Sequence, residues 1–201
     1  LYAGGTYLLT FLGNQVLADL LSDLLARCTL VALMVRAKPQ AALSHEDHAA
    51  ILQALEARGE GMWMEDPGFP LIRPVIEQAG VTLHPVAVDE DGMDVEWITQ
   101  RPTTARFALL TPAHQSPTGV ALSLPRRRQL LDWAAHHDAW IIEDDYDSEF
   151  RYQGKPLPPL KSLDAPQRVI YAGTFSKSLF PALRTAWLVV PLPLVAAFRR
   201  Q

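Results

Sequence analysis

A single cysteine, Cys28, occurs among the 201 residues, which excludes an internal disulfide and suits a reducing compartment. The sequence also lacks a basic-then-apolar signal peptide and any apolar run near the roughly 20 residues of a membrane span. Positive charge is not in excess, because 18 basic residues stand against 22 acidic ones. These absences predict a cytoplasmic protein that binds neither a membrane nor, through this segment, nucleic acid.

The composition is ordinary for a globular domain, with 49% hydrophobic and 20% charged residues. Short β-branched and aromatic runs alternate with stretches of helical spacing. This alternation predicts an α/β fold, with helices around a mostly parallel sheet. Strands are expected at 62–64, 81–88, 106–110, 140–142, 168–172 and 185–190, and helices at 49–58, 71–79 and 124–137. In the last of these helices, we expect Arg126, Arg127 and Arg128 to form a solvated face.

The first 59 residues are less regular than the rest. Residues 14–27 have helical spacing, and residues 28–35 are compatible with either a buried strand or more helix. Ser44 and Ser123 are each expected to cap the helix that follows. We therefore expect two segments: a helical one over 1–59 and a larger α/β domain over 60–201.

The stretch from Gly173 to Arg184 carries the strongest chemical signal. It follows the expected strand 168–172, and ligands of open α/β sheets bind at the carboxyl ends of strands. Lys177 lies between two hydroxyls, Thr174 and Ser176, which suit a phosphate, as does Arg184. A lysine amine with a lowered pKa attacks carbonyls. The pattern indicates a Schiff-base lysine for pyridoxal phosphate (PLP), although a solvated surface lysine is the common alternative.

A cluster of carboxylates follows the apolar run 140–142. PLP works best with a protonated pyridine nitrogen, which a carboxylate must stabilise. Residues two apart in a strand share a face, so Asp144 and Tyr146 should point the same way and Asp145 the opposite way. This alternation selects Asp144 for the ring nitrogen and Tyr146 for the ring oxygen, whereas a solvated acidic turn is the simpler alternative.

These blocks resemble the aminotransferase domain of MocR-type regulators of the GntR family. They are also similar to the related 2-aminoadipate-type aminotransferases, which are PLP proteins of fold type I. The resemblance runs from about Gly61 to the end of the chain and includes residues 143–152 and 173–177. It implies Lys177 as the catalytic Schiff-base residue and, as cofactor-binding residues, Asp144, Tyr146, Thr174, Ser176 and Arg184.

Two further positions follow from the resemblance. Phe69, in the turn after the strand at 62–64, takes the place of the aromatic residue that stacks on the cofactor ring. Ser116 stands where related aminotransferases have an asparagine that donates to the ring oxygen. Because its hydroxyl is shorter, Tyr146 is expected to provide more of that hydrogen bonding. His114, in the same turn, is expected to be a satisfied loop histidine.

The sequence departs from the family before Gly59. Residues 42–47 occupy the place of a glycine-rich phosphate-binding turn, but they contain no glycine and two acids, Glu46 and Asp47. The small C-terminal domain and the DNA-binding winged helix of MocR-type proteins are also missing, and the first residue is Leu1. We therefore expect an incomplete fold-type-I major domain. Separately, we expect no metal site.

Three functions are compatible with the sequence. The first is amino group transfer between an amino acid and a 2-oxo acid, with PLP as cofactor. The second is the effector-sensing module of a MocR-type regulator, which detects an amine or amino acid at the same site. The third is an inactive fragment. For the complete protein, the resemblance implies a homodimer.

Overall fold

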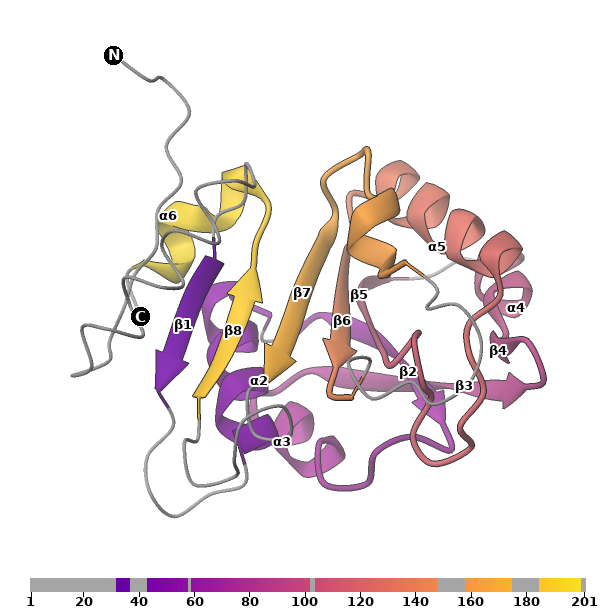
Figure 1. Ribbon diagram of the computed structural model, residues 1–201, viewed down its shortest axis with the longest axis horizontal. Helices are drawn as coiled ribbons and strands as arrows, with labels where there is room; N and C mark the ends of the chain where they lie inside the picture. The colour runs from indigo at the N-terminus through magenta and orange to yellow at the C-terminus, as the bar shows by residue number, and fades with distance from the viewer. Residues whose placement is uncertain are drawn as a thin grey trace.

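The computed structural model describes residues 32–36, 43–57, 59–101, 104–147, 158–174 and 185–199. Its centre is an eight-stranded sheet with the order β1-β8-β7-β6-β5-β2-β3-β4, shown in Figure 1. The strands are β1 (Ala32–Arg36), β2 (Gly61–Asp66), β3 (Thr82–Asp89), β4 (Gly92–Met93), β5 (Ala105–Leu110), β6 (Trp140–Asp145), β7 (Val169–Thr174) and β8 (Thr185–Val189). The helices are α2 (Leu43–Ala54), α3 (Arg73–Gln78), α4 (Val95–Thr99), α5 (Leu124–His136) and α6 (Val195–Phe198), with short 3₁₀ turns η2 (Leu160–Leu163) and η4 (Leu192–Leu194).

The central strands of the sheet are parallel. Strands β3, β2, β5, β6 and β7 run in one direction. Strand β8 is antiparallel to β7, β1 is antiparallel to β8, and β4 is antiparallel to β3. The prediction of a mostly parallel α/β fold is thus confirmed.

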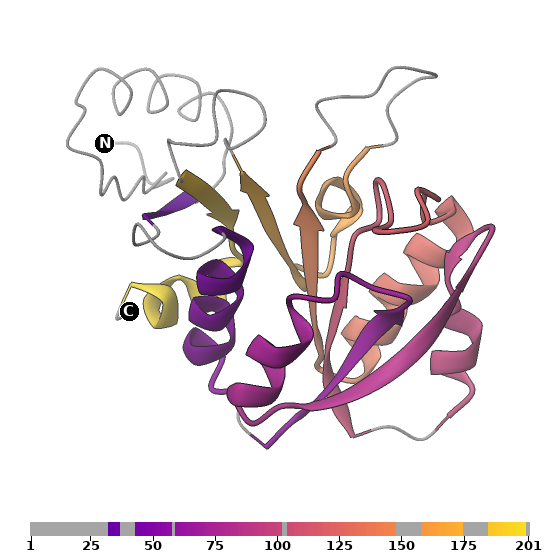
Figure 2. The ribbon, with the colours of Figure 1, turned by 90° about the horizontal axis from the view of Figure 1, so that it is seen from below.

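Two apolar cores lie on the two faces of this sheet. On one face, α2, α3 and α6 pack against side chains such as Ile142 of β6. On the other face, α4 and α5 pack against the alternate residues, such as Ile141. Figure 2 shows α2 and α3 on one side of the sheet and α5 on the other. Since both faces are covered, the central strands are apolar along most of their length.

The strand order reverses between β2 and β5: successive strands are added toward one edge of the sheet after β2 and toward the other edge after β5. From β2 the chain crosses to β3 through α3, on one face, and from β5 it crosses to β6 through α5, on the other face. The adjacent carboxyl ends of β2 and β5 therefore form a topological switch point. Ligands of open α/β sheets bind at such points.

Most expected elements are confirmed to within a few residues, and the described part of the run 28–35 lies in strand β1 (Ala32–Arg36). Of the two predicted N-caps, the position of Ser123 is confirmed and that of Ser44 is wrong. Helix α2 already begins at Leu43, so Ser44 lies within its first turn, and Ser123 occupies the N-cap of α5 without a side-chain cap bond. The expected helix at 14–27 lies outside the described residues. The division at residue 59 stays a prediction, although β1 and α2 precede it and β1 pairs with β8.

The prediction that Arg127 is solvated is wrong. Its side chain is only 1% exposed, and its guanidinium donates to the carbonyl oxygens of Leu122, Pro112 and Pro158 at 2.6–2.8 Å. The planar fork of arginine donors suits several acceptors at once. Arg127 therefore ties α5 to the loop before it and to the chain that follows β6. No helix in the described part of the chain is long and apolar enough to cross a membrane.

Candidate cofactor site

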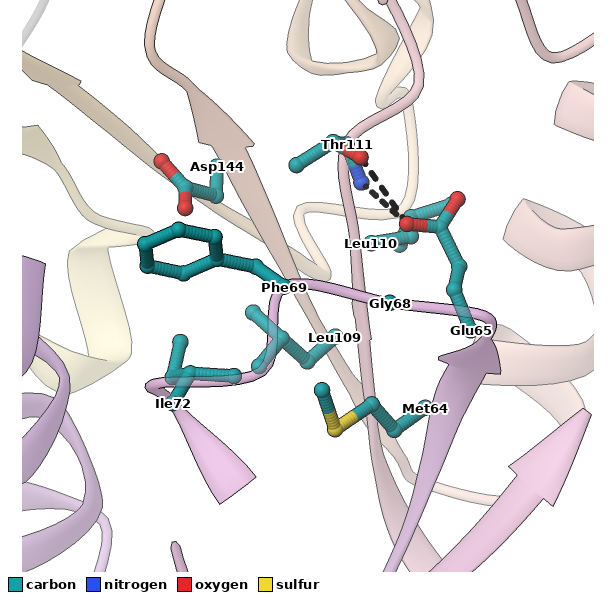
Figure 3. Close-up of a pocket in the computed structure, with 9 residues that line it drawn as sticks. All are labelled: Met64, Glu65, Gly68, Phe69, Ile72, Leu109, Leu110, Thr111 and Asp144. Atoms are coloured by element: carbon teal, nitrogen blue, oxygen red, sulfur yellow. Dashed lines mark hydrogen bonds between the residues drawn. The ribbon is translucent and has the colours of Figure 1, made fainter. Parts of the chain in front are cut away.

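A pocket lies at the carboxyl ends of β2, β5 and β6, next to the switch point. Figure 3 shows the side chains around it, which come from these three strand ends and from the turn after β2. Both apolar and polar groups face this space. The lining residues are Met64, Glu65, Gly68, Phe69, Ile72, Leu109, Leu110, Thr111 and Asp144.

Asp144 and Asp145 point to opposite faces of β6, as the strand alternation predicts. Asp144 lines the pocket with a side chain 17% exposed, and its Oδ2 lies 3.6 Å from Nε2 of His48 on α2. Asp145 is buried on the other face, where it accepts a hydrogen bond from the hydroxyl of Tyr171 on β7. Of the two adjacent carboxylates, Asp144 is thus the one available to a ligand in the pocket.

An aromatic ring accompanies this carboxylate. Figure 3 shows the phenyl ring of Phe69 lying beside the carboxylate of Asp144. Phe69 is half-buried and packs against the apolar core that includes α2 and α3. A flat, positively charged aromatic ring would stack on the phenyl face and pair its charge with the carboxylate.

Tyr146 and Ser116, both assigned from the sequence to the ring oxygen, are brought together by the fold. The Tyr146 hydroxyl donates to the carbonyl oxygen of His114 at 3.0 Å and is also hydrogen-bonded to the Ser116 side chain. Burial, followed by the charges of Asp147 and Asp144, raises the pKa of Tyr146 to about 12. The phenol therefore stays protonated at neutral pH and is able to donate a hydrogen bond.

His114 has the satisfied loop environment expected from the sequence. Its Nδ1 lies 2.7 Å from Oδ2 of Asp147, and its ring stacks on that of Tyr146 at a centroid distance of 6.2 Å. The His114–Asp147 pair therefore fixes the loop after β5 against the end of β6.

Glu65 and Gln115 also belong to this site, although neither was predicted from the sequence. Glu65 is 4% exposed, and its Oε2 accepts from the Thr111 amide at 3.1 Å, the Thr111 hydroxyl at 2.9 Å and Nε2 of Gln115 at 3.3 Å. Burial raises the pKa of Glu65 to about 7, against the opposing effect of these hydrogen bonds. Its position directly after the apolar run 62–64 is the same signal that identified Asp144.

Glu143 is a second buried carboxylate, and it does not line this pocket. It accepts from the backbone amides of Leu160 and Lys161, each at 2.7 Å, at the start of η2. Burial raises its pKa to about 7, and the repulsion of Asp145 adds to the shift. Glu143 therefore holds the start of η2 against β6.

Glu143 should make stability depend on pH. Its pKa is about 7 when folded and near 4.5 when unfolded, so the native chain binds the extra proton between these values. The free energy of unfolding contributed by this group should then fall as pH rises from about 4.5 to about 7. Glu143→Gln should make the measured slope shallower and leave the part due to Glu65, whose pKa is also raised to about 7, as seen by urea unfolding of both chains across this range. An unchanged slope would show that Glu143 is ionised throughout.

The phosphate side of the predicted site is only partly described. Thr174, half-buried, ends β7 next to the end of β6, at the same edge of the sheet as Asp144. Lys177, Ser176 and Arg184 lie outside the described residues, and their assigned roles stay predictions. The same holds for the side chains of residues 42–47.

Comparison with known proteins gives consistent matches. The family profile described as "Aminotransferase class I and II" matches residues 13–201. The chain is 45% identical over 131 residues to the uncharacterized HTH-type transcriptional regulator YdeL of Bacillus subtilis, covering 65% of this chain and 28% of the relative. It is 43% identical over 150 residues to the probable rhizopine catabolism regulatory protein MocR of Rhizobium meliloti, covering 75% of this chain and 30% of the relative.

Among solved structures, the chain is similar to the kynurenine aminotransferase of Pyrococcus horikoshii. The TM-score is 0.80 at 25% identity, over 94% of this chain and 48% of that one. The chain thus spans about a third of the regulators' length and about half of the enzyme's length. The matched half of the enzyme has the same α/β fold.

Proposed function

The chain belongs to the class I and II aminotransferase family, and on that premise we propose that it is the effector-sensing, PLP-binding domain of a MocR-type transcriptional regulator. The family is PLP-dependent. The observation that carries the proposal is the identity of 43–45% to two HTH-type regulators, which exceeds the 36% identity over 110 residues to an aromatic-amino-acid aminotransferase. A regulator uses the cofactor to detect an amine or amino acid, whereas an enzyme uses it for turnover.

The pocket suits the ring of PLP. Asp144 supplies the acid for the pyridine nitrogen and Phe69 supplies an apolar face. The hydroxyls of Tyr146 and Ser116, which are not among the pocket-lining residues, are proposed as donors for the ring oxygen. When bound, PLP provides an aldehyde that condenses with amines and a ring that accepts electrons. Lys177 is proposed as the attachment point, with the phosphate near Thr174, Ser176 and Arg184.

Each residue has a definite task in this proposal. The carboxylate of Asp144 keeps a proton on the pyridine nitrogen, because an adjacent negative charge favours the cationic form. The phenol of Tyr146, kept protonated by its raised pKa, is proposed to turn its single O–H from the carbonyl oxygen of His114 to the ring oxygen. Phe69 covers one face of the ring and keeps water from it.

Transamination is the second candidate, favoured by the structural similarity to an aminotransferase. The sensing proposal predicts that amines bind without being consumed. Amino acids added to the PLP-loaded chain should change its visible absorbance, while a coupled assay with 2-oxoglutarate should detect no appreciable product. This follows because much of an enzyme's rate comes from positioning, and a substrate carboxylate has no assigned partner among these residues.

Two results would oppose this proposal. Turnover at a rate typical of aminotransferases would favour the enzyme, and an absorbance that no amine alters would favour an inactive fragment. The complete protein is further proposed to be a cytoplasmic homodimer that responds to a small amine or amino acid.

A further inference from the structure

Two loops border the candidate cofactor pocket, one through Gly68, Phe69 and Ile72 and the other through Thr111, and each carries a residue proposed to contact the ring. The loop after β2, residues 66–72, carries Phe69. The loop after β5, residues 111–123, carries Ser116 and, through the carbonyl of His114, contacts Tyr146. The distance between the ring of Phe69 and the hydroxyl of Ser116 therefore depends on the contacts that hold these two loops together.

The contacts between the two loops converge on Glu65 and Gln115. Both side chains are buried, at 4% and 1% exposure. Nε2 of Gln115 lies 2.8 Å from the carbonyl oxygen of Pro67 in the first loop and 3.3 Å from Oε2 of Glu65. Glu65 in turn accepts hydrogen bonds from both the backbone amide and the hydroxyl of Thr111, the first residue of the second loop.

The same network continues to Ser116. The backbone amide of Ser116 donates to the hydroxyl oxygen of Thr111 at 3.2 Å, so that hydroxyl bridges Ser116 and Glu65. The side-chain oxygen of Gln115 accepts from the amide of Thr118 at 3.0 Å and from its hydroxyl at 2.6 Å. One continuous chain of hydrogen bonds thus runs from the loop of Phe69 to the donor loop.

We infer that Glu65, Thr111 and Gln115 form a positioning clasp that sets the distance between Phe69 and Ser116 and so adapts the pocket to a flat ring. The inference rests on the proposed function. Glu65 acts through its neighbours and is a positioning residue. Buried networks of this kind fix one arrangement, because each broken bond leaves a desolvated polar group unpaired.

Thr111→Val tests the clasp with little change in shape. It removes the hydroxyl that bridges Glu65 and the Ser116 amide, and the apparent affinity for PLP should fall about 5- to 30-fold for two such bonds. Glu65→Gln keeps the size and weakens one shared acceptor, so its effect should be smaller, about fivefold. The double variant should lose no more than Thr111→Val alone, because both changes act on one network.

Glu143→Gln is the matched control. Glu143 is also a buried carboxylate with a pKa raised to about 7, yet it accepts from Leu160 and Lys161 outside the pocket. The Glu143→Gln substitution should leave PLP affinity and the circular dichroism of bound PLP unchanged. Thr111→Val should reduce that dichroism, because the ring is then less firmly oriented. Equal losses of affinity in Thr111→Val and Glu143→Gln, or none in Thr111→Val, would overturn the clasp.

Hydrogen exchange separates this inference from the proposed function, because it needs no cofactor. In Thr111→Val, the amide of Ser116 should exchange faster, while amides in the middle of β6 keep their rates. Unchanged exchange at Ser116 would overturn the clasp. A wild-type chain that binds no PLP but shows the faster exchange in the variant would refute the proposed function while supporting the clasp itself.

Discussion

Asp144→Asn should lower the affinity of the chain for PLP by about 10- to 100-fold. The estimate follows from the loss of a charge-assisted hydrogen bond worth roughly 1.5–3 kcal/mol, since 1.4 kcal/mol corresponds to a tenfold change. Asp144 lines the pocket beside Phe69, and an amide in its place would not stabilise a protonated pyridine. The absorbance of the protonated Schiff base should fall in the same variant, as measured by titration of PLP into each chain.

Asp145→Asn is the control on the adjacent residue. Its carboxylate accepts from Tyr171 on the opposite face of β6, and an amide oxygen is able to accept the same bond. Affinity for PLP should then stay within roughly twofold of the wild-type value. Equal effects of the two substitutions would mean that the alternation along β6 does not determine which acid meets the cofactor.

Lys177→Ala should abolish covalent attachment of PLP and weaken its retention by about 100-fold or more, a loss of roughly 3 kcal/mol or more. The proposed Schiff base is the one covalent link in the site, whereas Asp144, Phe69 and Tyr146 make non-covalent contacts. Gel filtration of the PLP-loaded chain, followed by its visible spectrum, measures retention.

Lys161→Ala is a suitable control for that experiment. Lys161 pairs with Asp164 at 2.7 Å in the chain between β6 and β7, outside the pocket. The Lys161→Ala variant should keep PLP attached. Equal loss of PLP in both variants would place the attachment elsewhere or show that these substitutions act through the fold.

The sequence predicted the sheet well for a physical reason. Strands such as β5 and β7 are short apolar runs between breakers, and their burial on both faces makes them continuous apolar segments. The alternation of side chains in a strand also separated Asp144 from Asp145 without any knowledge of their neighbours. The boundary of β6 was less predictable, because its last residues are acids that are stabilised by tertiary contacts.

The polar network of the pocket was not predictable from the sequence. Glu65 bonds to Thr111 and Gln115 across 46 and 50 residues, and no local spacing relates these positions. The burial of Arg127 was also not predictable: three arginines in a row on a helix suggest solvent, yet this one donates to the carbonyl groups of Leu122, Pro112 and Pro158, which lie 5, 15 and 31 residues away. The short β4 and α4 carry too few residues for a periodic pattern.

The two predictions with the largest effects share one premise, that this chain holds PLP through Lys177 with the ring nitrogen at Asp144. The most direct measurement is reduction of the PLP-loaded wild-type chain with borohydride, followed by peptide mapping. The proposal predicts a single phosphopyridoxyl label on Lys177, greatly reduced in yield in Asp144→Asn. A label on another lysine, or no label at saturating PLP, would contradict it.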